Sequence, residues 1–350
     1  EDASVSTLDA LANASDVDDG ASLSIVNVPT TLPAGVTYDA VHHTFTLDPG
    51  NAAYQHLAVG QTTVVTVNYG VSDGIAPTPT AASVSWTITG TNDAPTVSGA
   101  VTATVAEDAS VSTLDALANA SDVDDGASLF VVNVPTTLPA GVTYDAVHHT
   151  FTLDPGNAAY QHLAAGQTTV VTVNYGITDG IVTAPTAASV SWTITGTNDA
   201  PMVSAALTDT ANEGDAAFTR NLLTHASDVD DGDTLSVANV SYTVDGGSAS
   251  GIPPAGISLS GSTLNIDPAH PSFDHLAFGQ STKIQVSYDV KDLLGLLVHQ
   301  TETITINGTN DAPTVAGPLT DAANEGDAAF SRNLLTGAAD VDDGDILSVV

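Results

Sequence analysis

The chain repeats itself with a period slightly above one hundred residues, and this periodicity limits the possible folds more than any other feature. The hexapeptide G-T-N-D-A-P begins at Gly90, Gly196 and Gly308, so its copies stand 106 and 112 residues apart. Residues 1–95 and 107–201 differ at only 8 of 95 positions. Such a period matches a whole domain, whereas solenoid units repeat every roughly 20–50 residues. The sequence therefore predicts a tandem array of domains.

The linker motif marks the expected domain boundaries. We expect the first repeat, which lacks its first strand, at residues 1–91, followed by repeats at 92–197 and 198–309 and a truncated repeat at 310–350. The third repeat is longer, mostly through an insertion at Val244–Pro254. Because the chain opens inside one repeat and stops inside another, we expect it to be part of a longer array.

Hydrophobic alternation within a repeat predicts β-structure throughout. Thr63–Val71 and Ser83–Gly90 alternate β-branched and polar residues, and residues 36–47 are typical of a hairpin. Gly, Pro and Asp interrupt such runs about every 8–12 residues, which favours an antiparallel, Ig-like β-sandwich. We expect one helical turn at Ala52–Ala58. Trp86 and Trp192 are predicted to lie in the core, because repeat three has Ile304 at the same position.

The charge balance excludes several classes of partner. The chain has 41 acidic residues against 4 basic ones, a net charge of −37. Nucleic acid and anionic membranes both need a basic face, so neither is expected as a partner. No segment is long and apolar enough for direct membrane insertion. The absence of Cys excludes thiolate zinc sites and Cys nucleophiles. No G-x-S-x-G nucleophile motif is present, and near-identical tandem domains favour a protein that is not an enzyme.

Acidic residues stand at fixed positions of the repeat. Four of the five glutamates are in phase, at Glu1, Glu107, Glu213 and Glu325. The loop D-V-D-D-G recurs at Asp16, Asp122, Asp228 and Asp340. Ca²⁺ takes six to eight oxygen ligands in irregular geometry, and clustered carboxylates repel one another without a cation. The pattern predicts calcium binding, and the alternative is turn chemistry and solubility alone.

The order of these motifs resembles a known family. A Val-x-Glu-Asp or Val-x-Glu-Asn start, then A-x-D-x-D-x-G, an Asp-Gly, and a closing T-I-x-G-T-N-D-A-P resemble the cadherin repeat. The phrase L-A-x-G-Q makes the chain more similar to VCBS-type cadherin-like repeats of large bacterial surface and secreted adhesins of the RTX type. This resemblance implies a cadherin-like fold, an extracellular or cell-surface location, secretion by a bacterial type I system, and a role in cell adhesion or biofilm.

The resemblance also implies where calcium should lie, namely between consecutive domains. The first junction would use Glu1, Asn92, Asp93, Asp122, Asp124 and Asp179. The second would use Glu107, Asn198, Asp199, Asp228, Asp230 and Asp292. The third would use Glu213, Asn310, Asp311, Asp340 and Asp342. The same phases in repeat one hold Asp16, Asp18 and Asp73. Alternatively, each D-V-D-D-G loop binds calcium alone, within one repeat.

One departure from the cadherin pattern bears on the number of ions. Cadherins carry an acidic D-R-E motif in mid-domain, and here Leu57–Gln61 contains no acid. Each junction would then hold fewer ions, or hold them more weakly. We interpret the chain as a non-catalytic extracellular stalk stiffened by Ca²⁺. The alternatives are repeats that bind cell-surface glycans or other copies of the array directly, or a spacer in a secreted multidomain enzyme.

Overall fold

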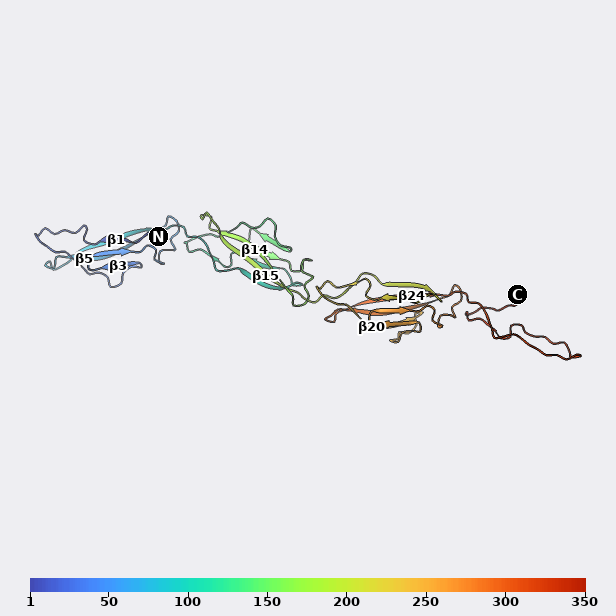
Figure 1. Ribbon diagram of the computed structural model, residues 1–350. Helices are drawn as coiled ribbons and strands as arrows, with labels where there is room; N and C mark the ends of the chain where they lie inside the picture. The colour runs from blue at the N-terminus through green and yellow to red at the C-terminus, as the bar shows by residue number, and fades with distance from the viewer. The chain divides into compact units, whose positions relative to one another are not determined.

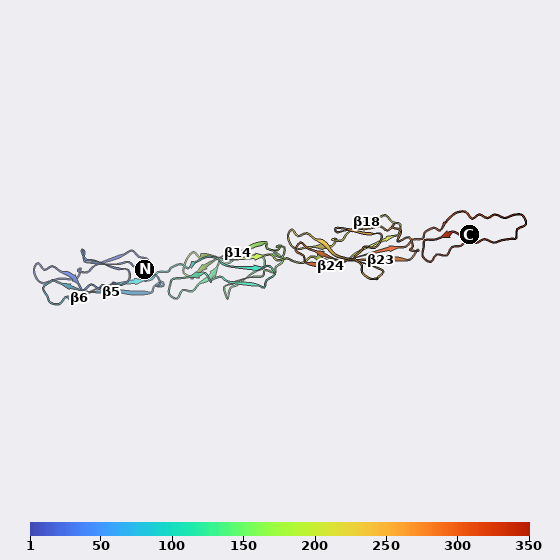
Figure 2. The same cartoon turned by 90° about the horizontal axis from the view of Figure 1, so that it is seen from below.

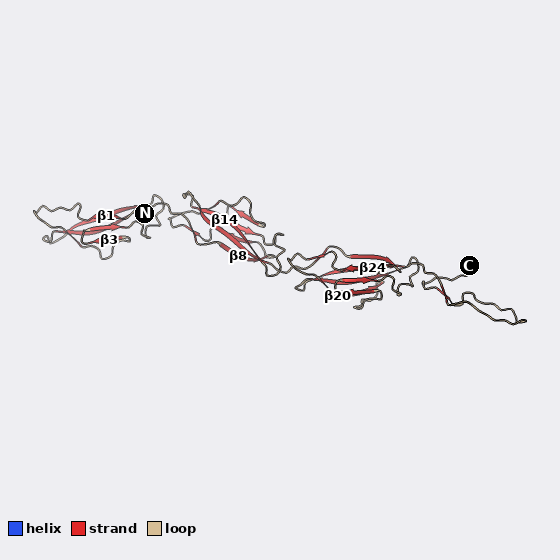
Figure 3. Cartoon of the chain, viewed as in Figure 1, coloured by secondary structure: helices blue, strands red, loops and turns tan.

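The computed structural model describes residues 1–350 and contains two compact units. The first comprises residues 1–160 and 168–195, and the second comprises residues 161–167 and 196–350. Both are built from strands and turns without a helix, which confirms the all-β prediction (Figures 1 and 3). Accordingly, the structure offers no helix with the length and apolar character to cross a bilayer.

The second repeat shows the complete pair of sheets. One sheet has the order β11-β14-β15-β8, with bounds Phe130–Val132, Thr168–Thr178, Thr186–Thr195 and Val101–Ala106. The other has the order β12-β13-β9, with bounds Val142–Asp145, Thr150–Leu153 and Ser112–Asp115. All pairings are antiparallel except that of β8, which runs parallel to β15. A short ladder joins β7 (Thr96–Val97) and β10 (Ala120–Ser121).

The first repeat has the same sheets without the parallel strand. Its sheets have the orders β2-β5-β6 and β1-β4-β3. Their bounds are Ser24–Val26, Thr62–Ser72, Thr80–Thr89, Ser6–Asp9, Thr44–Leu47 and Val36–Asp39. The strands expected from alternation are therefore present. The prediction of one helical turn at Ala52–Ala58 is wrong, because residues 52–56 form two successive turns. The amide of Tyr54 donates to the carbonyl of Asn51, and the amide of Leu57 donates to the carbonyl of Tyr54.

In the second unit, repeat three has the sheets β20-β23-β24-β17 and β18-β22-β21. Figure 2 labels β18, β23 and β24 of this repeat. Their bounds are Ser236–Val244, Ser281–Lys291, Leu297–Asn307, Leu207–Asn212, Phe218–Asn221, Thr263–Ile266 and Ile257–Ser260. Two short ladders pair β16 with β19 and β25 with β26, with bounds Met202–Val203, Ala226–Ser227, Thr314–Val315 and Ala338–Ala339. The insertion lengthens β20 and returns through a bridge between Tyr242 and Ser250.

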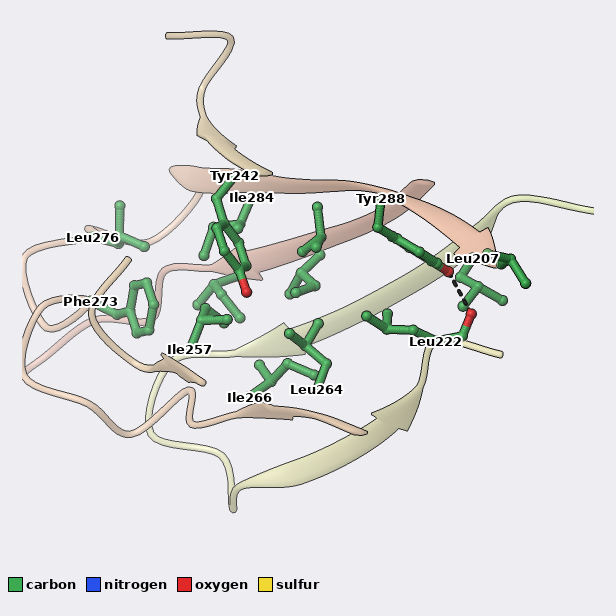
Figure 4. Close-up of a cluster of buried hydrophobic side chains, with 14 residues drawn as sticks. Leu207, Leu222, Tyr242, Ile257, Leu264, Ile266, Phe273, Leu276, Ile284 and Tyr288 are labelled. Carbon is green, nitrogen blue, oxygen red and sulfur yellow. Dashed lines mark hydrogen bonds between the residues drawn. The ribbon is translucent and has the colours of Figure 1, made fainter. Parts of the chain in front are cut away.

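Alternation explains where the core lies. Along β23, Ile284, Val286, Tyr288 and Val290 are buried and the intervening residues are less so. These side chains pack against residues of the facing sheet (Figure 4). The tryptophans lie in the core as predicted, because Trp86 is 7% and Trp192 0% exposed. Because every second side chain of a strand faces the other sheet, burying these residues removes apolar surface from water and stabilises the sandwich.

A buried tyrosine ties the two sheets together in each complete core. The hydroxyl of Tyr288 donates a hydrogen bond of 2.7 Å to the carbonyl of Leu222 (Figure 4). Tyr69 and Tyr175 donate equivalent bonds in repeats one and two. We expect Tyr288→Phe to lower the free energy of unfolding by about 1–2 kcal/mol, because the buried carbonyl loses its partner. Urea unfolding measures this.

Tyr242→Phe is the matched control for this prediction. Tyr242 is buried in the same core, and its hydroxyl makes no hydrogen bond. Equal costs for the two variants would show that the bond to Leu222 contributes nothing.

Candidate metal centres in the two units

The base of repeat one presents a buried glutamate. The amino group of Glu1 donates to the carbonyl of Thr89 at 2.7 Å, which continues the strand pairing of repeat one. Its carboxylate oxygen Oε1 accepts a hydrogen bond of 3.0 Å from the amide of Thr91 in the linker. Glu1 is only 4% exposed. The linker and the start of repeat one thus hold this carboxylate in a fixed position.

The D-V-D-D-G loop of repeat two brings a second carboxylate to the same place. Asp122 Oδ1 accepts from the amide of Asp124 at 3.0 Å, an Asx-type turn that Gly126 closes at a positive φ of 79°. Asp124 Oδ2 accepts from the amide of Asp93 in the linker at 3.1 Å. The amide of Asp125 donates to the carbonyl of His56 at 2.8 Å. The loop is therefore attached both to the linker and to repeat one.

Three carboxylates converge at this point. One oxygen each from Glu1, Asp93 and Asp124 lie within 4.8 Å of one another. Glu1 Oε2, Asp93 Oδ2 and Asp124 Oδ1 are buried and have no hydrogen-bond partner. Burial raises the pKa of Asp93 and of Asp124, and neighbouring carboxylates raise both further. The group therefore lacks positive charge, which a proton or a cation would supply.

Asn92 and Asp179, both predicted ligands, contact each other, and their role in binding metal stays a prediction. Asn92 Nδ2 donates to Asp179 Oδ2 at 2.7 Å. Burial raises the pKa of Asp179, but hydrogen bonds from Val182, Ile181 and Asn92 outweigh it and lower the pKa below its usual value. These hydrogen bonds favour the ionised form of Asp179. The charge of Asp122 also raises the pKa of Asp93 and Asp124, and Asp122 has a buried oxygen, Oδ2, without a hydrogen-bond partner.

The second unit contains the same arrangement around Glu213, Asp311 and Asp342. One carboxylate oxygen from each lies within 4.8 Å of the others. The amide of Thr309 donates to Glu213 Oε1 at 2.6 Å, and the amide of Asp311 donates to Asp342 Oδ2 at 2.9 Å. Glu213 and Asp342 are 7% and 5% exposed, and Glu213 Oε2 and Asp342 Oδ1 have no partner. Asn310 donates to the carbonyl of Asp311, and Asp340 Oδ1 accepts from the amide of Asp342.

The residues predicted as ligands at the second junction are divided between the two units. In the first, the amide of Glu107 donates to Thr195 at 3.0 Å, and Glu107 is fully buried. In the second, Asp199 donates through its amide to Asp230 Oδ2 at 3.1 Å, and Asn198 Nδ2 donates to Asp292 Oδ2 at 2.6 Å. Burial raises the pKa of Asp230, as it does for Asp124. The prediction of a shared site rests on the sequence repeat alone.

Two acids in the second unit were missed in the sequence. Asp233 approaches Asp228 and Asp292 to within 4.8 Å, and Asp345 does the same with Asp340 and Asp342. Both directly follow the glycine of D-V-D-D-G, whereas repeats one and two have alanine there. The longer motif D-V-D-D-G-D was the sequence feature from which these two additional acids could have been predicted.

The corresponding acids of repeat one are arranged differently. Asp16 and Asp18 are exposed, and Asp16 Oδ1 accepts only from the amide of Asp18. Asp73 accepts from the amides of Ala76 and Ile75, which lower its pKa. None of the three joins a converging group of carboxylates. Their role in binding metal stays a prediction.

Comparisons with known proteins find one family match and several similar solved structures. Residues 91–195 match the cadherin-like domain family. Mouse cadherin-23 EC22–24 is 15% identical over 84% of this chain and 89% of its own, with a TM-score of 0.45. Mouse clustered PcdhgC3 EC1–3 is 13% identical over 81% of this chain and 88% of its own, with a TM-score of 0.42. Drosophila N-cadherin EC1–4 is 13% identical over 83% of this chain and 68% of its own, with a TM-score of 0.32. No curated protein matches in sequence. The match to the cadherin-like domain family thus covers residues 91–195, which lie within a tandem array of β-sandwich domains.

Proposed function

We propose that the chain is a non-catalytic extracellular stalk whose repeat junctions bind Ca²⁺ and stiffen as a result. The observation that carries this proposal is the convergence of Glu1, Asp93 and Asp124, repeated at Glu213, Asp311 and Asp342. In each group, a nearly buried glutamate and aspartate keep an oxygen without any hydrogen-bond partner. Buried polar atoms are rarely left in this condition unless a ligand satisfies them.

The chemistry of the donors fits calcium. Every available donor is a carboxylate or amide oxygen, and the chain has no cysteine thiolate to favour zinc. A bound divalent cation would supply the positive charge that these groups lack. Glu1, Asp93 and Asp124 would hold it, with Asp122 adding its unpartnered oxygen. In the second unit, Asp228, Asp233 and Asp292 form a further group of oxygens.

The stiffening follows from where the carboxylates come from. Glu1 belongs to one repeat, Asp93 belongs to the linker, and Asp124 belongs to the loop of the next repeat. Ionised carboxylates repel one another, so without a cation the linker gains freedom to bend. With their charge neutralised, the three segments hold together. Extracellular calcium modules bind at about 10⁻⁴–10⁻³ M, so the stalk would be loose in a low-calcium cytosol and rigid outside.

Cadherin-like repeats are typical of extracellular adhesion and extender modules. We propose a large bacterial surface or secreted adhesin as the context, on the resemblance of L-A-x-G-Q and G-T-N-D-A-P to VCBS-type repeats. The acids and amides at the same phases, Glu107, Asn198, Asp199, Asp228, Asp230 and Asp292, belong to the same proposal as calcium ligands, on sequence equivalence alone.

Small-angle scattering tests this function. We expect the maximum dimension of the chain to increase in millimolar Ca²⁺ and to relax on chelation, because neutralised junctions bend less. Mg²⁺ at the same concentration is the control, since it demands tighter octahedral geometry and keeps its waters. An unchanged dimension in Ca²⁺ would refute stiffening of the junctions.

A further inference from the structure

A glutamate lies in the hydrophobic core of repeat three. Glu302 is on β24, in phase with the buried Ile304 and Ile306, and it is 0% exposed. In the parallel ladder with the first strand, Glu302 pairs with Leu207, as Val190 pairs with Val101 in repeat two. A carboxyl group thus occupies the place of a valine. Burial of an ionised carboxylate is strongly unfavourable unless the charge is compensated.

An ion pair lies at the edge of this core, at two further positions that are apolar in repeat two. Asp209 on β17 accepts from both Nε, at 2.7 Å, and Nη2 of Arg220 on β18. By register, Asp209 stands where repeat two has Ala103, and Arg220 where it has Leu114. Three apolar positions have therefore changed together into two acids and one base.

The ion pair leaves Glu302 without compensation. Asp209 takes two donors of Arg220, and neither Oε1 nor Oε2 of Glu302 has a hydrogen-bond partner. One positive charge thus faces two carboxyl groups. Ionisation of Glu302 would leave an excess negative charge in the core, whereas protonation removes it.

The charged and titratable groups that face Glu302 influence whether its carboxyl group is protonated. On the strands packed around it, the inward-facing charged or titratable side chains are Asp209 of β17, Arg220 of β18 and Tyr288 of β23. Burial raises the pKa of Glu302 to about 7, Asp209 adds to this increase, and Arg220 opposes it. The Tyr288 hydroxyl is engaged with Leu222 and has its own pKa raised by burial and by Glu302.

We propose that Glu302 is a proton-binding site in the core of repeat three, which makes the stability of this repeat fall as the pH rises through neutrality. An unfolded glutamate titrates near pH 4.3–4.5, so the folded repeat holds the proton over a pH range where the unfolded chain releases it. Stability is then greatest below that range, falls across it, and levels off once the folded group has ionised. The site lies apart from the calcium groups and acts independently of the proposed function.

Denaturation at two pH values tests the site. In saturating Ca²⁺, we expect the unfolding equilibrium constant of repeat three to rise roughly 70-fold from pH 5 to pH 8 through this group. Glu302→Gln and Glu302→Val, the latter with the residue of repeat two, should abolish that part of the dependence. Glu325→Gln, at an exposed glutamate, should retain it. A wild-type pH dependence in Glu302→Gln would overturn the proposal.

A direct titration avoids any dependence on the stability of the variants. The chain has five glutamates, so ¹³C labelling of their carboxyl carbons should produce five resonances. The resonance missing from Glu302→Gln identifies the buried group. We expect the titration midpoint of this resonance to lie near neutral pH in the folded, calcium-loaded chain. A midpoint at the ordinary value for glutamate would overturn the proposal as well.

Discussion

Asp124→Asn is expected to change the stability of the first unit in opposite directions with and without calcium. In chelator, the substitution removes one of three converging carboxylates and should raise the free energy of unfolding, because burial and its neighbours already disfavour the charge of Asp124. In Ca²⁺ at about 100 times the dissociation constant, a lost site should cost about 2.7 kcal/mol. Thermal unfolding in the two buffers measures both effects.

Asp18→Asn is the matched control. Asp18 has the same place in the loop of repeat one, but it is exposed and does not join a converging group. It should shift stability little in either buffer. If Asp124→Asn were destabilising to the same extent in chelator and in calcium, its role would be local turn chemistry.

The pH dependence of the first unit should also reverse with calcium. The pKa values of Asp93 and Asp124 are raised, so in chelator these groups contribute stability at acidic pH that is lost as the pH rises through their folded pKa values. In Ca²⁺ the ionised forms bind the metal, so stability should rise with pH. The same falling trend in both buffers would argue against metal binding by these residues.

Gly308→Ala is expected to cost about 3 kcal/mol of folding free energy, at the upper end of overpacking costs. A Cβ at this position would lie 2.2 Å from the carbonyl oxygen of Leu276 and 2.4 Å from that of Ala277. Backbone hydrogen bonds from Gly308 to Gln280 and from Gln280 to Ala277, both 2.9 Å, hold these segments together. The obstacle is backbone, so no side chain can move aside.

Gly251→Ala provides the comparison, because no atom would lie within 4 Å of its new Cβ and its φ is not positive. Equal urea midpoints for Gly308→Ala and Gly251→Ala would contradict the steric argument. The equivalent Gly90 and Gly196 have the same close approach, to Leu57 and Leu163 respectively. Steric exclusion therefore explains why G-T-N-D-A-P starts with glycine in all three copies.

Local patterns accounted for the strands and much of the core. The alternation in Thr63–Val71 predicted β5, and the shared position of Trp192 and Ile304 predicted burial of both. Alternation is a local property, because successive side chains of a strand face opposite sides of the sheet. It did not predict that β8 pairs parallel to β15, since the pairing partner of a strand depends on residues far along the chain.

The sequence repeat by itself determined which acids recur at one phase, since residues at one phase occupy equivalent positions in equivalent domains, but it did not point to Asp233 and Asp345. Only the tertiary structure decided how they group: Glu1 with Asp93 and Asp124, but Asp179 with Asn92. It also revealed Glu302 as an uncompensated carboxyl group, which alternation alone interprets as one more residue of a strand. The physical reason is that convergence and burial depend on strand register and on loops joined across long chain separations, and a local pattern does not contain that information.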